Sequence, residues 1–200
     1  MPTSFIVVDD FLENPDGFRQ QALALTYPEQ DEPYPGRNSL QRMELPGLSE
    51  HISHIVGERL RPIEPLESHA KCRLALGNDK RRGDIHVDTS QWSGILYLTP
   101  DEACKGGTEF YRHKRTGLER AAITDEEAHR MGFAGRDQLL EDTINRDGNR
   151  YAAWTKTMEI PMRFNRLVLL RPWLFHTAGP SFGKTPEQGR LVYLMFFTLA

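Results

Sequence analysis

From about residue 70 onward, the chain consists largely of short stretches in which apolar residues alternate with polar or small ones. Ala70, Cys72, Leu74 and Leu76 show this alternation first. A period of two residues is typical of a β-strand with one buried face. Similar stretches follow, separated by clusters of Gly, Pro, Asn or Asp. They predict strands over residues 84–88, 92–99, 108–111, 155–162, 166–170, 174–177 and 190–199, in addition to an apolar strand over residues 5–8.

Two stretches ahead of most of these strands have helical periodicity instead. Asn14 and Pro15 form a typical helix start, and apolar residues recur at helical spacing after them, which predicts a helix over residues 15–26. A second helix is expected to begin near Ser49. Short strands following two helices predict a mostly β (α+β) fold. We expect a β-sandwich or a jelly roll (double-stranded β-helix) whose helices buttress one sheet.

Residues 114–153 break this pattern because they are highly charged. Residues 124–127, Thr-Asp-Glu-Glu, have the form of a capping box, and two short helices are expected over about 125–131 and 136–145. Too few apolar residues are present to build a separate core. We therefore interpret residues 1–200 as a single domain with an insertion. The insertion is either a surface feature or a lid over a site.

The composition narrows the class of protein without identifying a function. The chain has 200 residues, 38% of them hydrophobic, and 25 basic against 28 acidic residues give a formal net charge of −3. These values exclude a collagen-like, disordered or disulfide-framework protein, and they disfavour a nucleic-acid partner. The two cysteines suggest a reducing compartment. Neither a secretory signal nor an apolar run of membrane-spanning length is evident, so we expect a soluble cytoplasmic protein without a membrane partner.

Candidate chemistry lies in the segment His86-Val87-Asp88. On a strand, residues two apart face the same way, so His86 and Asp88 can hold one metal ion, and this pair suits Fe(II), Mn or Zn. His176, at the end of an apolar run, is either a satisfied core residue or a third ligand. Arg190 begins a strand that is apolar on both faces, and a buried guanidinium needs an anionic partner. That partner is either a carboxylate of the protein or a bound anionic ligand.

The order of these residues resembles the iron(II)- and 2-oxoglutarate-dependent oxygenases, specifically their small prolyl-hydroxylase-like branch. The family pattern is His-X-Asp, a distant His, and an Arg ten to fourteen residues further on. In this chain Arg190 follows His176 by fourteen positions. The resemblance extends over about residues 69–111 and 160–199.

The resemblance implies a role for each matching residue. The iron ligands, which are also the catalytic centre, would be His86, Asp88 and His176. Arg190 would pair with the distal carboxylate of 2-oxoglutarate. Tyr97 stands where related hydroxylases offer a phenol to the same carboxylate, and Thr108 would add a hydroxyl; alternatively, Tyr97 is plain core and Thr108 an edge-strand residue.

The implied activity is an oxidation that uses Fe(II), 2-oxoglutarate as cosubstrate and O2. A carboxylate at Asp88 favours hydroxylation over halogenation, because related halogenases have a small residue there. The substrate would be a small molecule or an amino-acid or peptidyl side chain. Candidates for its binding, each of which can also be structural, are Arg73, Arg112, Trp92, Trp154 and Trp173.

The alternative function is a non-enzymatic, cupin-like jelly-roll protein that binds a metal or another ligand. Arg190 favours the enzyme, since a simple metal site has no need of it. The remaining histidines lie on a predicted helix, at the start of a strand or beside charge runs. None has a partner at ligand spacing that competes with the first pair, so we interpret them as solvent-facing or structural; they are His51, His54, His69, His113 and His129.

Overall fold

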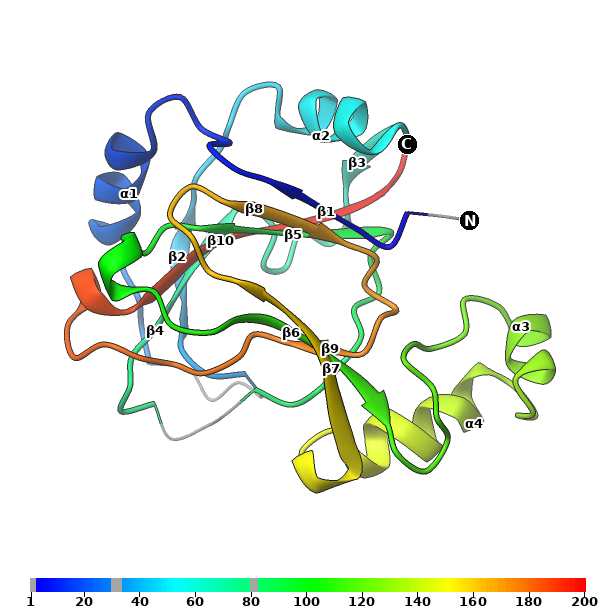
Figure 1. Cartoon of the computed structure of the whole chain (residues 1–200). Helices are drawn as coiled ribbons and strands as arrows, with labels where there is room; N and C mark the ends of the chain where they lie inside the picture. The colour runs from blue at the N-terminus through cyan, green and yellow to red at the C-terminus, as the bar shows by residue number, and fades with distance from the viewer. Residues whose placement is uncertain (1–2, 30–33, 80–82) are drawn as a thin grey trace.

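The computed structural model describes residues 3–29, 34–79 and 83–200, and its strands form two antiparallel sheets (Figure 1). Strand β3 pairs with β10 beside the main path of the larger sheet. In spatial order that path is β1 (Phe5–Val8), β8 (Leu167–Leu170), β5 (Trp92–Tyr97), β10 (Arg190–Leu199), β4 (Lys71–Ala75) and β2 (Arg37–Arg42), with β3 at Leu60–Pro62. The smaller sheet comprises β7 (Trp154–Pro161), β6 (Gly107–His113) and β9 (His176–Thr177).

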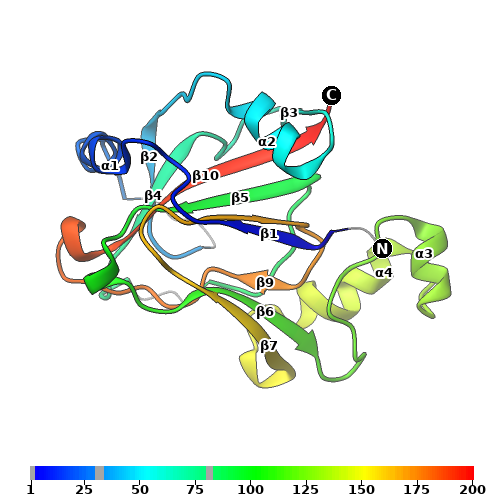
Figure 2. The same cartoon turned by 45° about the horizontal axis from the view of Figure 1, so that its top comes forward.

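The larger sheet is buried on both faces. Alternate residues of β10 lie in different apolar clusters: Val192 and Leu194 pack toward the smaller sheet with Phe110 and Ile160, whereas Tyr193 packs on the opposite face. This confirms the expectation that the last strand is apolar on both sides. Figure 2 shows the smaller sheet lying across from the larger one. The two sheets therefore face each other across the apolar cluster that contains Val192 and Phe110.

Two helices cover the outer face of the larger sheet (Figure 1). Helix α1 (Pro15–Leu23) starts as expected, with the Asn14 side chain accepting a hydrogen bond from the Gly17 amide. It ends three residues before the predicted limit because Thr26 bonds to strand β2 instead: its carbonyl accepts from the Leu40 amide. Helix α2 (Leu48–Val56) begins at the predicted place.

The predicted strand over residues 84–88 is wrong. Only His86 forms a bridge, with His176, while the Ile85 amide donates to Gly148 and the Asp88 amide to Pro172. Because consecutive amides bond to different segments, no ladder can form. The predicted strand over residues 174–177 is likewise reduced to β9. The other predicted strands are present, with ends that shift by one or two residues.

The insertion packs against one end of the smaller sheet. It contains α3 (Asp125–Arg130) and α4 (Arg136–Leu140), and a π-helical turn at Glu141–Asn145 replaces the end of the second predicted helix. Its buried side chains, such as Leu139, join Phe175 and Ile85 in a third apolar cluster. Short 3-10 turns lie at Asp101–Ala103, Tyr151–Ala153 and Pro186–Gln188. No helix in the described part of the chain has the length and apolar character that crossing a membrane requires.

Candidate metal centre

The bridge between His86 and His176 brings two distant segments together between the sheets. Each residue donates its amide to the carbonyl of the other, at 2.9 Å and 3.1 Å. The two imidazole rings consequently lie side by side, with centroids 4.5 Å apart. Asp88 follows two residues after His86 and reaches the same point. The three predicted ligands are thus assembled without a regular strand at residues 84–88.

The donor atoms of the three side chains all lie within 4.8 Å of one another. Asp88 Oδ1 is 3.7 Å from His86 Nε2, and Asp88 Oδ2 is 3.7 Å from His176 Nε2. Each imidazole Nδ1 contacts a backbone carbonyl at 2.7 Å, that of Asp84 for His86 and that of Leu174 for His176. A carbonyl can only accept, so Nδ1 carries the proton and Nε2 keeps its lone pair for a metal. This donor set fits a divalent transition-metal ion.

The electrostatics of the site keep Asp88 ionised. Burial by itself raises the pKa of this carboxyl, but His176, His86 and a hydrogen bond from Ser93 Oγ outweigh burial and hold it well below its usual range. Burial opposes protonation of His176, whereas the neighbouring Asp88 raises its pKa. For His86, burial and the second imidazole lower the pKa. The site thus presents an anionic oxygen between two imidazoles.

The three residues line a cavity of about 520 Å³ between the two sheets. Arg73, Thr108 and Arg190 line the same cavity, so the structure brings the predicted ligands and two buried or half-buried arginines into one space. Its volume is within the range of about 300–1,000 Å³ that is usual for small-molecule sites.

Arg190 is the first residue of β10 and is only 4% exposed. Its Nε has no hydrogen-bond partner, and no carboxylate of the described residues forms an ion pair with it. Burial lowers the pKa of this guanidinium. The salt-bridge alternative for Arg190 therefore finds no support in the described part of the chain. A buried guanidinium that lines a cavity and has no carboxylate partner among the described residues fits an anionic ligand.

Tyr97 and Thr108 form a buried pair next to Arg190. The Tyr97 hydroxyl lies 2.7 Å from Thr108 Oγ1, and the Arg190 guanidinium is 5.9 Å from the centre of the Tyr97 ring. Thr108 lines the cavity, whereas Tyr97 is fully buried and is not part of the lining. Burial raises the pKa of Tyr97. The hydroxyl that faces the cavity is consequently that of Thr108.

Of the five candidates for substrate binding, Arg73 alone lines this cavity. Trp92 and Trp154 are core residues, 0% and 3% exposed. Arg112 is exposed and pairs with Glu119 instead. Trp173 packs near the guanidinium of another arginine, away from the cavity lining. The three tryptophans and Arg112 therefore have structural or surface roles.

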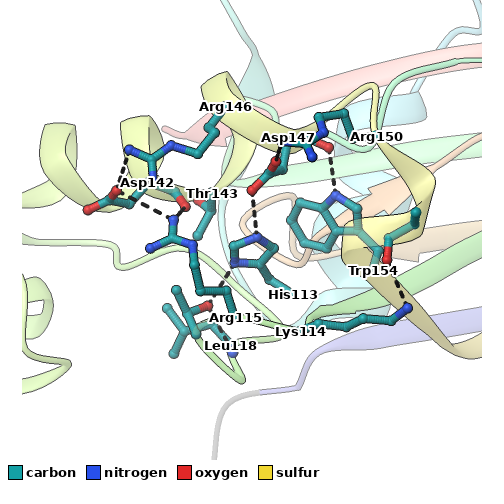
Figure 3. Close-up of polar contacts among 12 residues, drawn as sticks. His113, Lys114, Arg115, Leu118, Asp142, Thr143, Arg146, Asp147, Arg150 and Trp154 are labelled. Atoms are coloured by element: carbon teal, nitrogen blue, oxygen red, sulfur yellow. Dashed lines mark hydrogen bonds and ion pairs between the residues drawn. The ribbon is translucent and has the colours of Figure 1, made fainter.

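One histidine has a more defined environment than the sequence suggests. His113 is fully buried; its Nε2 lies 3.1 Å from Asp147 Oδ2, its Nδ1 lies 3.0 Å from Thr116 Oγ1, and its ring packs on Trp154 (Figure 3). The sequence left a solvent-facing and a structural role open for it, and the structure shows the structural one. The signal that could have revealed it is its position two residues after Tyr111, which places both side chains on the same face of β6.

The insertion borders the candidate metal site through residues on either side of Asp147. Ile144 and Gly148 line the cavity, and the Gly148 carbonyl accepts the Ile85 amide at 2.9 Å. A Cβ at Gly148 would lie 2.8 Å from the Ile85 carbonyl oxygen, so this approach requires glycine. The Tyr151 hydroxyl donates to the Gly83 carbonyl. The insertion thus supports the segment that carries the first two candidate ligands.

Two solved structures share this fold. HygX from Streptomyces hygroscopicus, solved with nickel, 2-oxoglutarate and hygromycin B bound, matches with a TM-score of 0.56 and 13% identity over 99% of this chain and 84% of that one. The non-heme alpha ketoglutarate dependent carbocyclase SnoK from nogalamycin biosynthesis matches with a TM-score of 0.54 and 14% identity over 100% and 87%. At these identities the similarity concerns the fold.

Sequence comparison gives the family. No curated protein matches the chain. A family model matches residues 2–197, which is nearly the whole sequence and includes every candidate site residue. The chain therefore belongs to DUF6445, a family of unknown function.

Proposed function

We propose that this protein is a non-haem Fe(II)- and 2-oxoglutarate-dependent oxygenase that hydroxylates a small molecule or an amino-acid or peptidyl side chain. The observation that carries the proposal is the buried, unpaired Nε of Arg190 in the same cavity as the His86, Asp88 and His176 cluster. A simple metal-binding protein needs the cluster but not the arginine. The proposal includes the double-stranded β-helix fold and the prolyl-hydroxylase-like branch.

The three clustered side chains would hold the iron and leave its remaining positions open. Their geometry suits this role, because the backbone carbonyls of Asp84 and Leu174 fix both imidazoles with Nε2 toward Asp88. Ser93 Oγ donates to Asp88 Oδ2 at 2.6 Å and orients that carboxylate. When bound, iron and 2-oxoglutarate would supply an oxidant derived from O2; the protein would supply the ligand geometry and the cavity that orients the substrate.

Arg190 would bind the distal carboxylate of 2-oxoglutarate, and Thr108 would donate its hydroxyl to the same group. Tyr97 acts through Thr108: their hydroxyls lie 2.7 Å apart, so Tyr97 accepts or donates a hydrogen bond that orients the threonine. Tyr97 is therefore a positioning residue in this proposal. The solved structure of HygX holds nickel and 2-oxoglutarate in a similar fold, which supports this pair of ligands.

The proposed location is the cytoplasm. Both cysteines of the chain, Cys72 and Cys104, are free thiols. Free thiols persist in the reducing conditions of that compartment.

The test is binding of Fe(II) and 2-oxoglutarate without oxygen. We expect a visible charge-transfer band for the wild-type protein. Arg190→Gln should weaken the binding of 2-oxoglutarate at least tenfold, since hydrogen bonds to charged groups contribute about 1.5–3 kcal/mol. The affinity for iron should stay nearly unchanged. Arg112→Gln, at an exposed arginine, is the matched control and should alter neither affinity.

Two results would contradict the proposal. If the wild-type protein binds iron but no 2-oxoglutarate, the cupin-like alternative is correct. If Arg190→Gln weakens iron and 2-oxoglutarate equally, with the fold intact by circular dichroism, Arg190 supports the fold of the site and does not bind the cosubstrate.

A further inference from the structure

The cavity contains a second guanidinium that the proposed function does not use. Arg73 lies on β4, in register with Asn38 of β2 and Val192 of β10, and it lines the cavity together with Arg190. It makes no ion pair with a carboxylate among residues 3–29, 34–79 and 83–200. Its presence in the cavity therefore needs a chemical explanation.

The contacts of Arg73 orient its guanidinium without neutralising it. Its Nε donates to Asn38 Oδ1 at 2.7 Å, and its plane lies over the Tyr34 ring, with the guanidinium carbon 3.5 Å from the ring centre. Both partners are uncharged. A guanidinium held in this way presents its remaining donors in a fixed plane, which suits bidentate binding of a carboxylate.

None of the described acidic groups that line the cavity forms an ion pair with Arg73 or Arg190. Asp88 attracts Arg73 electrostatically, but its direct contacts are with the two imidazoles and with Ser93. Asp84 and Glu67 also line the cavity, but both are exposed and neither pairs with Arg73. Burial lowers the pKa of Arg73 to about 10, so its side chain is still a cation at neutral pH. A divalent metal held by Asp88 and the two imidazoles, and a dianionic cosubstrate on Arg190, would leave Arg73 without a carboxylate in ion-pair contact among the described residues.

The wall beside Arg73 is apolar. Val192 lies directly opposite Arg73 on β10, and the cavity is also lined by Ile63, Ile95, Leu194 and Phe196. Such a wall favours contact with hydrocarbon. The cavity therefore offers one cationic group and one apolar surface to a second ligand.

We propose that Arg73 binds a carboxylate of the primary substrate, and that this substrate is a small carboxylic acid whose apolar body lies on the wall formed by β5 and β10. The proposal rests on the proposed function, because it assigns the cosubstrate to Arg190. It narrows the substrate class from any small molecule or side chain to an anionic, partly apolar one.

The test uses a carboxylate and its uncharged amide as probes. Protein loaded with Zn(II), which is redox-inert, and saturated with 2-oxoglutarate is titrated calorimetrically with 3-phenylpropanoate and with 3-phenylpropanamide. We expect the carboxylate to bind about tenfold more tightly, or better, to the wild-type protein. Arg73→Gln should abolish this preference while the affinity for 2-oxoglutarate stays nearly unchanged. Arg112→Gln should behave like the wild type, and Arg73→Met, which keeps an apolar stem, replaces the glutamine variant if that fails to fold.

The outcomes separate this inference from the function on which it rests. If 2-oxoglutarate does not bind the metal-loaded wild-type protein, the proposed function fails first. If 2-oxoglutarate binds but the carboxylate probe binds no better than the amide, or neither probe binds, the inference about Arg73 alone is overturned. A loss of 2-oxoglutarate affinity in Arg73→Gln as large as that in Arg190→Gln also overturns it, since Arg73 then serves the cosubstrate.

Discussion

The buried pair of His113 and Asp147 ties the insertion to strand β6, and its removal should destabilise the protein (Figure 3). In His113→Leu, a side chain of similar bulk keeps the packing against Trp154. Asp147 Oδ2 loses its donor at 3.1 Å, and Thr116 Oγ1 loses its contact at 3.0 Å. The substitution therefore isolates the polar contribution of the pair.

The magnitude follows from the burial of Asp147. Its side chain is 6% exposed, and a buried acceptor left without its donor costs about 1–3 kcal/mol. Arg150 still donates to Oδ1 at 2.9 Å, so the carboxylate keeps one charged partner and the cost stays below that of an isolated buried charge. We expect the free energy of unfolding to fall by about 2 kcal/mol, which for 200 residues corresponds to roughly 4–8 °C in Tm.

The assay is urea unfolding at neutral pH, followed by circular dichroism and tryptophan fluorescence. His54→Leu is the matched control: His54 is exposed on α2, and its replacement should change stability by no more than about 0.5 kcal/mol. A loss in His113→Leu as small as that of the control would refute the reasoning, because the pair would then contribute nothing. The double variant that combines His113→Leu with Asp147→Asn should lose less free energy of unfolding than the two single variants together, since the two residues share one hydrogen bond.

Three further predictions concern the site and the core. Ser93→Ala should weaken Zn(II) binding about 10–100-fold, since it removes the hydroxyl that orients Asp88; equilibrium dialysis against zinc measures this, and unchanged affinity would exclude that role. Burial opposes ionisation of Glu58, but Arg171 outweighs burial and lowers the pKa of this carboxyl. Glu58→Gln should therefore lower the free energy of unfolding by about 1–3 kcal/mol at neutral pH. Because the pKa of Glu58 is depressed in the folded state, the difference in free energy of unfolding between variant and wild type should shrink as the pH falls below the ordinary glutamate value of 4.5. Urea titrations measure this difference, and a difference that does not change with pH would contradict the ion pair of Glu58 with Arg171. Burial raises the pKa of Cys72 to about 12, so mass spectrometry should detect its alkylation by iodoacetamide at pH 8 only after unfolding; rapid labelling of the native protein would contradict its burial.

The sequence predicted most strands because alternation is a local property. Along β10, which is apolar on both faces, successive residues separate into two apolar clusters, as Val192 and Tyr193 show. The capping box at Thr124 likewise marks the start of α3, with the threonine side chain accepting the Glu127 amide. The order of His86, Asp88, His176 and Arg190 was sufficient to suggest the site. The alternation and the capping box each lie within a few residues, and the candidate site was suggested only by the order of its residues along the chain.

The tertiary structure decided what depends on contacts between distant segments. Residues 84–88 have the composition of a strand, yet their amides bond to Gly148 and Pro172, so only the bridge to His176 forms. The unpaired state of Arg190 became visible only once the groups around it were in place.

The neighbours of a side chain determine its role, and the sequence does not specify them when they come from far along the chain. His113 lies among charges in sequence but is enclosed by Asp147 and Trp154 in space. Arg73 is one arginine among many until β4 brings it into the cavity with Arg190. The sequence by itself determined the alternating strands, because alternation is a local pattern, and it suggested the candidate ligands through their order along the chain. Folding decided which charges are left without a partner, because burial and charge balance are properties of the assembled cavity.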